Sequence, residues 1–449
     1  MPWLLNCVYV LLLLAVSPVL LYRRLVLKKY RTGWREKLWG ELPELPAGQT
    51  RIWFHAVSVG EVLLLRPVLK RLEEERPDCQ IVISTTTSTG YEVAKTQFGR
   101  HTICYFPLDF SWAVQRALKR IRPSVVALVE LELWPNFLLA ARKQNVPVVL
   151  INGRISEHSY KGYRRIRPLM RRLLQALTRA AVQSETYAER LIKLGVPAER
   201  VYVTGSVKFD GVQTDRNNPK TQELKTCFGL QDHETVWVVG STHAPEEEYA
   251  LQSWLELKEE FPDLRLVLVP RHQERFEAVA ELVERKGLPL LRRSRLKESG
   301  QSKSERTSGP AGSPLSSQKP VLLLDTLGEL SGCWGLAQIA FVGGSLTSRG
   351  GQNMIEPAAY GAAVLFGPNT HNFRDVVELL LANQAARVVH SPQELTEQVR
   401  RLLRFPQEAQ TMGNRARSIV LAQQGATEKT VQMLCHLLPT NSEQQRPAA

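Results

Sequence analysis

Trp-Phe-His-Ala-Val-Ser-Val-Gly-Glu-Val, at Trp53–Val62, is the stretch from which the fold can be predicted. Its opening residues form an apolar run with β-branched members, which predicts a buried strand. Gly60 allows a sharp turn, and the apolar periodicity of Val62–Arg71 predicts a helix directly behind it. Glu61 is therefore expected at a strand-to-helix turn, on the edge where open α/β sheets bind ligands. A helix N-terminus favours a charged carboxylate, so Glu61 is either a catalytic base or only a cap of its helix.

The same alternation of strand and helix runs through the chain twice. Helical patterns separate the predicted strands, which implies parallel sheets with helices on both faces. In the first half, the predicted strands are Ile52–Ser58, Gln80–Thr86, Thr102–Phe106, Ser124–Val129, Val146–Ile151, Ala180–Gln183 and Val201–Thr204. In the second half, they are Val236–Gly240, Leu264–Pro270, Val321–Asp325, Ile339–Val342, Ala363–Phe366 and Ala386–Val389.

Length and composition fit two domains joined by a polar junction. The chain has 449 residues, too many for one ordinary core. We predict an α/β fold with two doubly wound Rossmann-like domains facing a cleft, as in B-type glycosyltransferases. The predicted boundaries are 23–210 for the first domain, 211–220 for the linker and 221–438 for the second domain. A segment at 293–319 and a tail at 439–449 are too polar to fold and are predicted to be disordered.

Charge and cysteine usage restrict the partners and the compartment. The net charge of +14 predicts an anionic partner, and no aromatic-basic motif of a nucleic-acid module accompanies it. A membrane surface or a phosphorylated substrate is therefore favoured over nucleic acid. The six cysteines are scattered without paired spacing, which indicates a reducing compartment and neither a disulfide framework nor a zinc site.

The N-terminus predicts a membrane anchor. Trp3–Tyr22 is a nearly unbroken apolar run, long enough to span a bilayer. It lacks a basic segment before it and a cleavage site after it, which argues against a signal peptide. We predict a membrane anchor at 1–22, and by the positive-inside rule the segment that follows it stays in the cytoplasm. The alternative is that the apolar segment lies in the membrane interface without crossing the bilayer. The basic residues behind it are Arg23, Arg24, Lys28, Lys29, Arg31, Arg35 and Lys37.

Polar residues follow the predicted strands of the first half. Glu130 and Glu132 follow one strand, and Lys208 lies in a glycine-containing turn after another. The two glutamates are a possible metal pair, but no histidine lies near them and the chain lacks an Asp-x-Asp motif. We therefore expect one carboxylate to point into the ligand crevice and a neighbour to satisfy the other. The cluster Thr85–Gly90 is interpreted as either part of this edge or an ordinary helix cap.

A basic amphipathic helix is predicted over Tyr160–Arg179. Apolar residues recur there at helical spacing, and no acidic residue occurs between Glu157 and Glu185. This pattern is typical of an anionic membrane surface or an acidic ligand, although the apolar face could simply be core. The arginines assigned to this contact are Arg164, Arg165, Arg167, Arg171 and Arg172.

Three stretches of the second half look suited to an anionic ligand. Arg271 follows a strand and could bind a phosphate or carboxylate. Leu327-Gly328-Glu329 opens a predicted helix. Gly343-Gly344-Ser345 leads into the helix that carries Glu356, and we expect its backbone N–H groups to face an anion, with Glu356 binding a ribose. A G-x-G-x-x-G motif follows the first strand of neither half, which argues against NAD or FAD.

Taken together, several motifs resemble the 3-deoxy-D-manno-octulosonate (Kdo) transferases of lipopolysaccharide synthesis, in that family's order and over nearly the whole chain. They are HAVSVGE at His55–Glu61, ELELWPN at Glu130–Asn136, TGSVKFD at Thr204–Asp210, VPRHQERF at Val269–Phe276, FVGGSLTSRGGQNMIEPAA at Phe341–Ala359 and GPNTHNF at Gly367–Phe373. The chain departs from the family at the insertion 293–319, and at Leu131, where the family often has threonine.

The resemblance implies a B-type enzyme of the cell inner membrane that moves Kdo from CMP-Kdo to a lipid A precursor, without a cofactor or metal. It implies that Glu61 is the general base and that Glu130 and Lys208 stabilise the transition state. The residues that it implies for CMP are Pro270, Arg271, Leu327, Gly328, Glu329, Asn353, Met354, Ile355 and Glu356. Two alternatives are a B-type transferase with another nucleotide sugar and a non-catalytic membrane scaffold.

Overall fold

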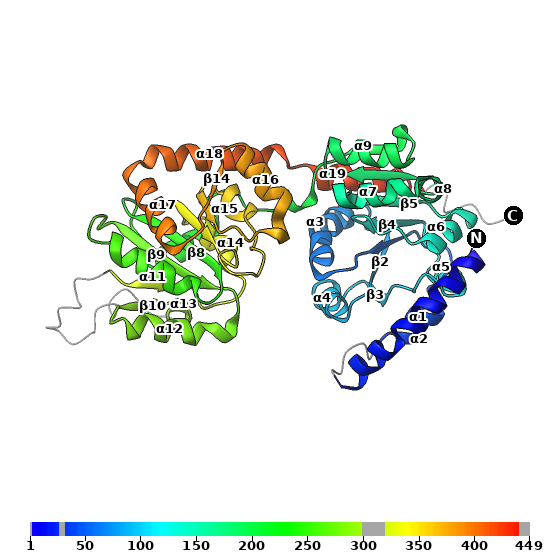
Figure 1. Ribbon diagram of the computed structural model, residues 1–449, viewed down its shortest axis with the longest axis horizontal. Coiled ribbons are helices and arrows are strands. Elements are labelled where there is room, and N and C mark those ends of the chain that lie inside the picture. The colour runs from blue at the N-terminus through cyan, green and yellow to red at the C-terminus, as the bar shows by residue number, and fades with distance from the viewer. Residues whose placement is uncertain (1, 27–31, 299–318, 440–449) are drawn as a thin grey trace. The chain divides into compact units, whose positions relative to one another are not determined.

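The computed structural model describes residues 2–26, 32–298 and 319–439. The chain forms two compact units (Figure 1). Unit 1 comprises residues 1–210 together with the C-terminal residues from Gln423 onward, and unit 2 comprises Gly211–Ala422. The C-terminal segment thus belongs to the first core, whereas the sequence analysis assigned residues up to 438 to the second. Of the tail predicted at 439–449, residues 440–449 lie outside the described residues.

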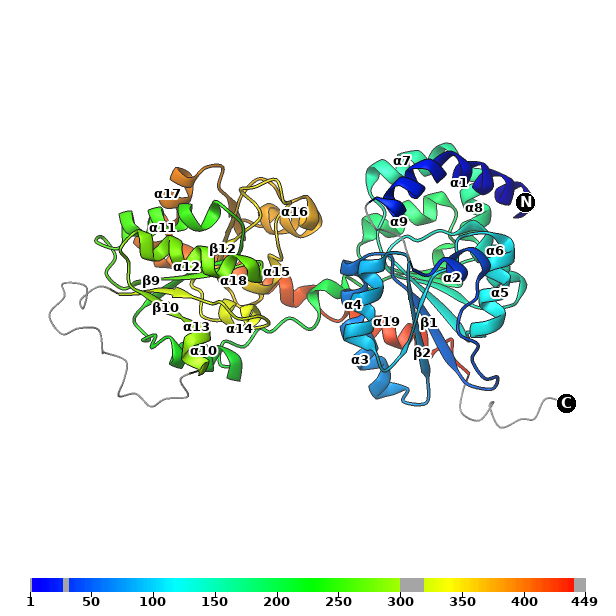
Figure 2. The ribbon, with the colours of Figure 1, turned by 90° about the horizontal axis from the view of Figure 1, so that it is seen from below.

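Unit 1 is built on a parallel sheet of seven strands in the order β3-β2-β1-β4-β5-β6-β7. Helices cover both faces of this sheet (Figure 2). Strand β1 runs beside β2 and β4 with Trp53 opposite Val82 and Val126, so the opening stretch lies in the middle of the sheet. The strands are β1 Arg51–His55, β2 Gln80–Thr85, β3 Thr102–Tyr105, β4 Val125–Val129, β5 Val148–Gly153, β6 Arg179–Val182 and β7 Val201–Val203.

The helices of unit 1 pack apolar faces onto the two sides of this sheet. Helix α3 buries Val62, Leu65 and Leu69, and the C-terminal helix α19 packs against it with Val431 and Leu434. The helices are α1 Pro2–Leu25, α2 Trp34–Trp39, α3 Val59–Glu75, α4 Ser88–Phe98, α5 Ser111–Ile121, α6 Pro135–Lys143, α7 Glu157–Arg165, α8 Arg167–Leu174, α9 Glu185–Leu194 and α19 Ala426–Cys435. Short 3₁₀ helices lie at Ala198–Arg200 and Val207–Phe209.

Unit 2 repeats the architecture with the strand order β10-β11-β9-β8-β12-β13-β14. Its strands are β8 Thr235–Thr242, β9 Leu264–Pro270, β10 Leu290–Arg292, β11 Val321–Leu323, β12 Ile339–Val342, β13 Ala363–Phe366 and β14 Ala386–Val388. Strand β10 was not predicted. The helices are α10 Pro219–Cys227, α11 Glu246–Leu257, α12 Phe276–Arg285, α13 Arg293–Glu298, α14 Leu330–Trp334, α15 Ile355–Ala359, α16 Arg374–Ala382, α17 Pro392–Arg404 and α18 Pro406–Ala422, with 3₁₀ turns at Gln273–Arg275 and His371–Phe373.

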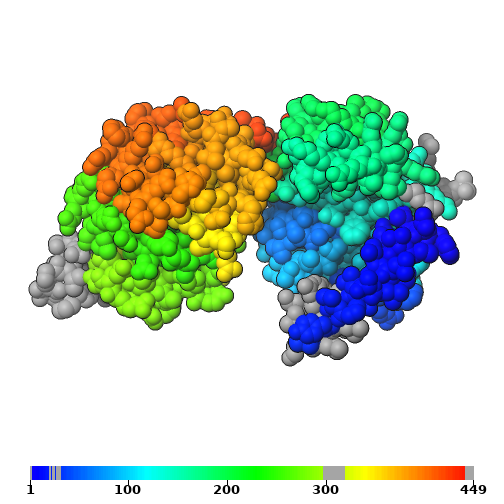
Figure 3. Space-filling view, in the orientation of Figure 1, coloured from blue at the N-terminus to red at the C-terminus, as the bar shows by residue number. Residues whose placement is uncertain are grey.

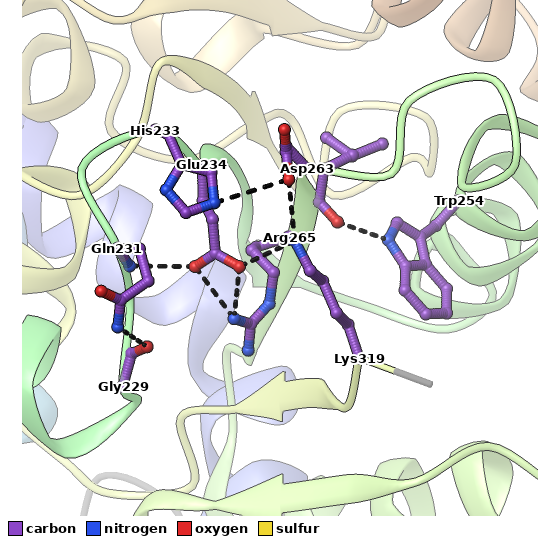
Figure 4. Close-up of polar contacts among 9 residues, drawn as sticks. Gly229, Gln231, His233, Glu234, Trp254, Asp263, Arg265 and Lys319 are labelled. Carbon is purple, nitrogen blue, oxygen red and sulfur yellow. Dashed lines mark hydrogen bonds and ion pairs between the residues drawn. The ribbon is translucent and has the colours of Figure 1, made fainter. Parts of the chain in front are cut away.

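A buried ion pair stabilises the amino edge of the second sheet (Figure 4). Arg265 Nη1 lies 3.0 Å from both carboxylate oxygens of Glu234, and both side chains are almost completely buried. Lys319 adds its ammonium at 2.9 Å from Glu234 and 3.1 Å from Asp263. This cluster is therefore structural, because it lies at the opposite end of the strands from the ligand-binding edge.

The predicted disorder at 293–319 is wrong at both of its ends. Arg293 is 1% exposed and binds the carboxylates of Glu223 and Glu329, and Lys319 is held as described above. Ser294 donates from its backbone N–H and its hydroxyl to Asp325. The polar composition of the segment gave no sign of these ion pairs and hydrogen bonds, because they join it to residues elsewhere in the chain. The rest of the predicted segment, 299–318, lies outside the described residues.

Helix α1 lies on the surface of unit 1 (Figure 3). Two polar side chains attach it there: the Asn6 amide bonds to Ser111 Oγ at 2.7 Å, and the Tyr9 hydroxyl donates to Asp109 at 2.9 Å. Its apolar residues remain largely uncovered, with Leu11 66% and Leu14 63% exposed. Among the described residues, no helix has both the length and the apolarity needed to cross a membrane, so the predicted anchor at 1–22 is not supported.

Candidate functional site

Glu61 lies at the carboxyl end of the central strand of unit 1, in the first turn of α3. Its carboxylate accepts a hydrogen bond from the Val57 N–H at 2.9 Å and another from the Ser58 hydroxyl at 2.7 Å. Ser58 is the N-cap and accepts in return from the Glu61 N–H. Glu61 therefore caps its helix and still presents a half-buried carboxylate at the ligand-binding edge, so its two expected roles are compatible.

Glu130 follows β4, the neighbour of β1, and adopts a left-handed conformation with φ 59°. Two cations lie beside its carboxylate. Arg154 Nε, in the loop after β5, is 3.6 Å from Oε2, and Lys208 Nζ is 3.9 Å from Oε1. Lys208 comes from the 3₁₀ turn after β7. The carboxyl edge of the first sheet thus brings the predicted residues Glu130 and Lys208 together, and it adds Arg154, which the sequence analysis did not assign.

Glu132 is the residue of this edge that the sequence analysis left undecided. Burial and, to a smaller extent, the negative charges of Glu61 and Glu130 raise the pKa of its carboxyl to about 7, against the opposing effect of a hydrogen bond with Trp134. Glu132 therefore lies within the electrostatic influence of Glu61 and Glu130 at this edge. The sequence pattern E-L-E indicated two acidic groups, but it did not show that one of them would hold its proton near neutral pH.

His55 belongs to the same motif as Glu61 but is part of the core. Its ring is fully buried and stacks on Phe106 with 3.7 Å between centroids, and its Nδ1 lies 3.1 Å from Ser84 Oγ. Burial lowers the pKa of His55 to about 3, so the ring is neutral at physiological pH. This histidine therefore supports the strand end that positions Glu61.

In unit 2, Arg271 follows β9 and its backbone N–H bonds to the Thr242 carbonyl at the end of β8. Its side chain is exposed and makes no ion pair with a described residue. Asn353 Nδ2 donates to Glu356 at 3.0 Å, and burial raises the pKa of Glu356 while the positive charge of Arg271 lowers it. The positive charge of Arg271 therefore reaches Glu356, and the binding of one ligand by both residues stays a prediction.

The other residues expected to bind CMP differ in what they can offer. The side chains of Pro270, Met354 and Ile355 are buried, so they can present only backbone groups to a ligand. Leu327 is 67% exposed and Gly328 has a φ of 81° with open space around it, which leaves this turn accessible. Glu329, in contrast, already binds Arg293, at 2.9 Å, and the Thr326 hydroxyl. Glu329 shapes the turn through these contacts.

The glycine-rich turn after β12 does not have free N–H groups for a ligand, and this expectation is wrong. The buried carboxylate of Glu246 accepts from the N–H groups of Gly344 at 2.7 Å, Ser345 at 3.1 Å and Leu346 at 3.0 Å. It also accepts from the His243 N–H at 2.9 Å. An internal anion thus occupies the position predicted for the ligand. Helix α15 behind the turn has only five residues, which weakens any dipole effect.

The predicted basic helix is interrupted. Helix α7 ends at Arg165 and α8 begins at Arg167, with Pro168 in its first turn, because proline cannot donate the hydrogen bond that a continuous helix needs. Met170, Leu173 and Leu174 are buried, whereas Ile166 and Leu169 are 47% and 40% exposed. All five arginines assigned to the anionic contact are exposed, and none forms an ion pair with a described residue: Arg164, Arg165, Arg167, Arg171 and Arg172.

Within the described ranges, no three His, Cys, Asp or Glu side chains are placed to hold a metal ion. At the edge of the first sheet, the Glu130 carboxylate instead lies beside two cations of the protein itself, Lys208 and Arg154.

Comparison with known proteins identifies the family. Residues 31–211 match the family model described as 3-deoxy-D-manno-octulosonic-acid transferase, and residues 339–434 match one described as glycosyl transferase-like. The chain is 32% identical to the 3-deoxy-D-manno-octulosonic acid transferase of Haemophilus influenzae over 87% of this chain and 88% of that one. The chain belongs to the Kdo transferase family. It is therefore a glycosyltransferase that uses a nucleotide-sugar donor.

Other relatives of this Kdo transferase agree with that assignment. The Bordetella pertussis 3-deoxy-D-manno-octulosonic acid transferase is 32% identical over 85% of this chain and 86% of its own length. Among solved structures, the UDP-GlcNAc 2-epimerase of Neisseria meningitidis covers 86% of this chain and all of its own, with a TM-score of 0.54 and 15% identity. MurG of Acinetobacter baumannii gives a TM-score of 0.52. These last two similarities concern the fold alone, and they support the predicted B-type fold with two parallel-sheet α/β domains.

Proposed function

We propose that this Kdo transferase moves Kdo from CMP-Kdo to a hydroxyl group of a lipid A precursor with inversion at the anomeric carbon. The observation that carries the proposal is the position of Glu61, a half-buried carboxylate at the end of the central strand, beside an edge that also holds Glu130, Lys208 and Arg154. Family membership supplies the sugar that is transferred.

In the proposed reaction, Glu61 accepts the proton of the acceptor hydroxyl as its oxygen attacks the anomeric carbon of Kdo. The bond between that carbon and the phosphate oxygen breaks, and CMP leaves with the bonding electron pair. Arg271, which has no carboxylate partner among the described residues, would meet the charge that develops on the phosphate. One direct displacement reverses the configuration at the anomeric carbon. Lys208 and Glu130 would stabilise the charges around the acceptor.

The donor nucleotide is assigned to unit 2. Glu356 would accept hydrogen bonds from ribose hydroxyls and Arg271 would contact the phosphate, while the accessible turn Leu327–Gly328 offers backbone groups to the base. Because CMP-Kdo contains one phosphate and no diphosphate, we propose that the reaction needs no divalent cation. Activity that EDTA abolishes and magnesium restores would contradict this part of the proposal.

The acceptor and the inner membrane are proposed from two surfaces of unit 1. Its five exposed arginines on α7 and α8 lie beside the exposed apolar side chains of Ile166 and Leu169, a combination suited to the phosphates and acyl chains of a lipid. Helix α1 adds uncovered apolar residues such as Leu11 and Leu14. Patches of this kind mark interaction sites on protein surfaces. We propose that unit 1 lies at the cytoplasmic face of that membrane.

The test is to incubate the purified protein with CMP-Kdo and a defined lipid A precursor and to weigh the product by mass spectrometry. A mass increase of one or more Kdo residues, with the anomeric configuration of the new bond opposite to that of the donor by NMR, is expected. Transfer from a UDP-sugar but not from CMP-Kdo would favour another B-type activity. A protein that binds membranes, transfers no sugar and tolerates loss of Glu61 would be a scaffold.

A further inference from the structure

A group of basic side chains at the carboxyl edge of the second sheet is not used by the nucleotide contacts described above. His243 follows β8 and His272 lies two residues after the end of β9, and their rings meet edge to face with 5.2 Å between centroids. Arg349 belongs to the loop that returns to Gly344, where the Gly351 N–H bonds to the Gly344 carbonyl. These three residues come from three neighbouring parts of the edge.

The atom that points to a ligand is His243 Nε2. His243 is only 8% exposed, and this ring nitrogen is buried without any hydrogen-bond partner. A buried polar atom without a partner is costly, and in native proteins such atoms usually have a partner that is an unseen water, ion or ligand. The position is also tightly packed: a Cβ atom at Gly344 would lie 3.3 Å from the His243 ring.

Glu246 and Glu247, the two buried carboxylates on the helix that follows His243, already have other partners. Glu246 accepts from four backbone N–H groups. Glu247 binds Arg275 at 2.9 Å and the Thr242 hydroxyl at 2.9 Å. Arg349 and Arg271 form no ion pair with a described residue. Burial lowers the pKa of His243, and the charges of His272, Arg349 and Arg271 lower it further, against the opposing effect of Glu247. The edge therefore has an excess of positive charge.

The order of the residues along the edge indicates which part of the donor lies there. Strand β8 lies between β9 and β12, so His243 lies between Arg271, which follows β9, and the loop after β12 that carries Arg349 and leads to Glu356. If Arg271 binds the phosphate, the sugar group attached to that phosphate falls beside His243, His272 and Arg349. In Kdo, a 2-keto sugar acid, the carbon that carries the phosphate also carries a carboxylate. That carboxylate is thus the anion nearest to the phosphate.

We propose that His243, His272 and Arg349 form a subsite for the carboxylate of the donor sugar, separate from the phosphate contact of Arg271. This inference rests on the proposed function. The subsite would select a nucleotide-linked sugar acid over a neutral sugar, because only the acid supplies a second negative charge at this place. A charge-assisted bidentate bond from Arg349 and a hydrogen bond from His243 Nε2 would fix the anomeric carbon.

The experiment compares two affinities in full-length protein: the dissociation constant of CMP by calorimetry and the KM of CMP-Kdo in the transfer assay. The variants are Arg349→Gln, at an exposed position, and His243→Asn, which removes Nε2. Arg285→Gln serves as a matched control, since Arg285 is exposed at the end of α12 without an ion pair to a described residue. We expect the KM of CMP-Kdo to rise about 10-fold or more in both variants, the scale of a charged hydrogen bond, with the CMP dissociation constant within about twofold of wild type.

Two results would overturn the subsite. If CMP and CMP-Kdo weakened equally, these residues would contact the phosphate, and if neither changed in Arg349→Gln and His243→Asn, they would contact no part of the donor. In both of these cases the wild-type protein still transfers Kdo. If the proposed function itself were wrong, the wild-type protein would neither bind CMP nor transfer Kdo, so the two kinds of failure can be told apart. If the proposed function is wrong, the proposed subsite for the donor carboxylate is wrong as well.

Discussion

Ser58 and Glu61 cap the first turn of α3 through reciprocal hydrogen bonds. The Ser58 hydroxyl donates to Glu61 Oε1 at 2.7 Å, and the Glu61 N–H donates to Ser58 Oγ at 3.3 Å. A serine at the cap with a glutamate three residues later forms a capping box, in which glutamine can replace glutamate. The same carboxylate is therefore held rigidly by its helix and available at the ligand-binding edge.

This pair permits a substitution that separates chemistry from folding. Glu61→Gln should lower turnover by about 100-fold or more, the usual scale for loss of a general base. CMP affinity and the melting temperature should stay close to wild type, because the glutamine carbonyl can still accept the Val57 N–H and the Ser58 hydroxyl can turn to accept from the glutamine amide. Ser58→Ala is the complementary control and should cost about 1 kcal/mol of stability as a lost cap. Less than about threefold loss of turnover in Glu61→Gln would mean that another group is the base.

The second prediction concerns the pH dependence contributed by Glu132. The pKa of Glu132 in the folded protein is about 7, above its ordinary value of 4.5. The folded state thus holds a proton that the unfolded state loses, and the stability from this group is complete below about pH 4.5 and is lost as the pH rises through 7. Glu132→Gln keeps a neutral side chain at every pH. The melting temperature of the variant relative to wild type should therefore rise between pH 5 and pH 8, and parallel pH profiles in calorimetry would contradict the assignment.

The third prediction concerns Glu246, which binds the turn Gly344–Leu346. Glu246→Ala should leave two buried N–H groups and one partly buried N–H group of that turn without an acceptor. Since an unsatisfied buried group costs about 1–3 kcal/mol, the free energy of unfolding should fall by more than about 2 kcal/mol in urea titrations. Glu248→Ala is the matched control, because Glu248 is the exposed neighbour on the same helix. Equal stability of the two variants would show that water replaces the carboxylate without cost.

The fourth prediction tests the nucleotide contacts of unit 2. Arg271→Ala removes the phosphate contact and Glu356→Ala the ribose contact, and each bond to a charged group is worth about 1.5–3 kcal/mol. The dissociation constant of CMP should rise about 10- to 100-fold in each variant, measured by calorimetry. Unchanged CMP affinity in both would remove the nucleotide from this edge, whereas a change in Arg271→Ala alone would leave the ribose without an assigned partner.

The fifth prediction concerns the exposed arginines of α7 and α8. Replacing Arg164, Arg165 and Arg172 with glutamine should raise the KM of the lipid acceptor and reduce sedimentation with anionic vesicles, more strongly at low salt, because each basic residue near an anionic surface contributes about 1 kcal/mol. CMP affinity should not change. A control with Lys119, Arg142 and Lys143 replaced by glutamine removes the same charge from other exposed positions of unit 1. Equal effects of the two triple variants would show that only net charge matters.

Much of the fold could be predicted because parallel strands that are buried on both faces give continuous apolar runs. The predicted strand Leu264–Pro270 coincides with β9, and Glu185–Leu194 coincides with helix α9. Strand β10 was missed because it has only three residues, Leu290–Arg292, all half-buried. The packing of α19 on unit 1 could not be predicted either, since amphipathic periodicity shows that a helix has a buried face but not which core receives it.

The candidate site was predictable to the extent that its residues follow strand ends. Glu61, Glu130 and Lys208 lie on one edge of the first sheet, in keeping with the rule for open α/β sheets. Tertiary partners decided the rest. Sequence could not show that Glu246 fills the glycine-rich turn, that Glu329 binds Arg293, or that His243 is buried without a partner, because each relationship joins residues distant in the chain or depends on packing.

The return of the C-terminal segment to unit 1 has a consequence for how the gene could be divided. Asp210, the last residue before unit 2, accepts hydrogen bonds from the N–H groups of Gly425 and Thr427, just after unit 2 ends. The two passages of the chain are thus fastened to each other, and residues 211–422 form an insertion whose ends lie together. A fragment that stops at residue 210 would lose the helix that covers α3, whereas 1–210 joined to 423–439 by a few glycines retains α3 and the 3₁₀ turn Val207–Phe209, against which that helix packs. Domain dissection of this enzyme should therefore excise the middle of the sequence and keep both ends.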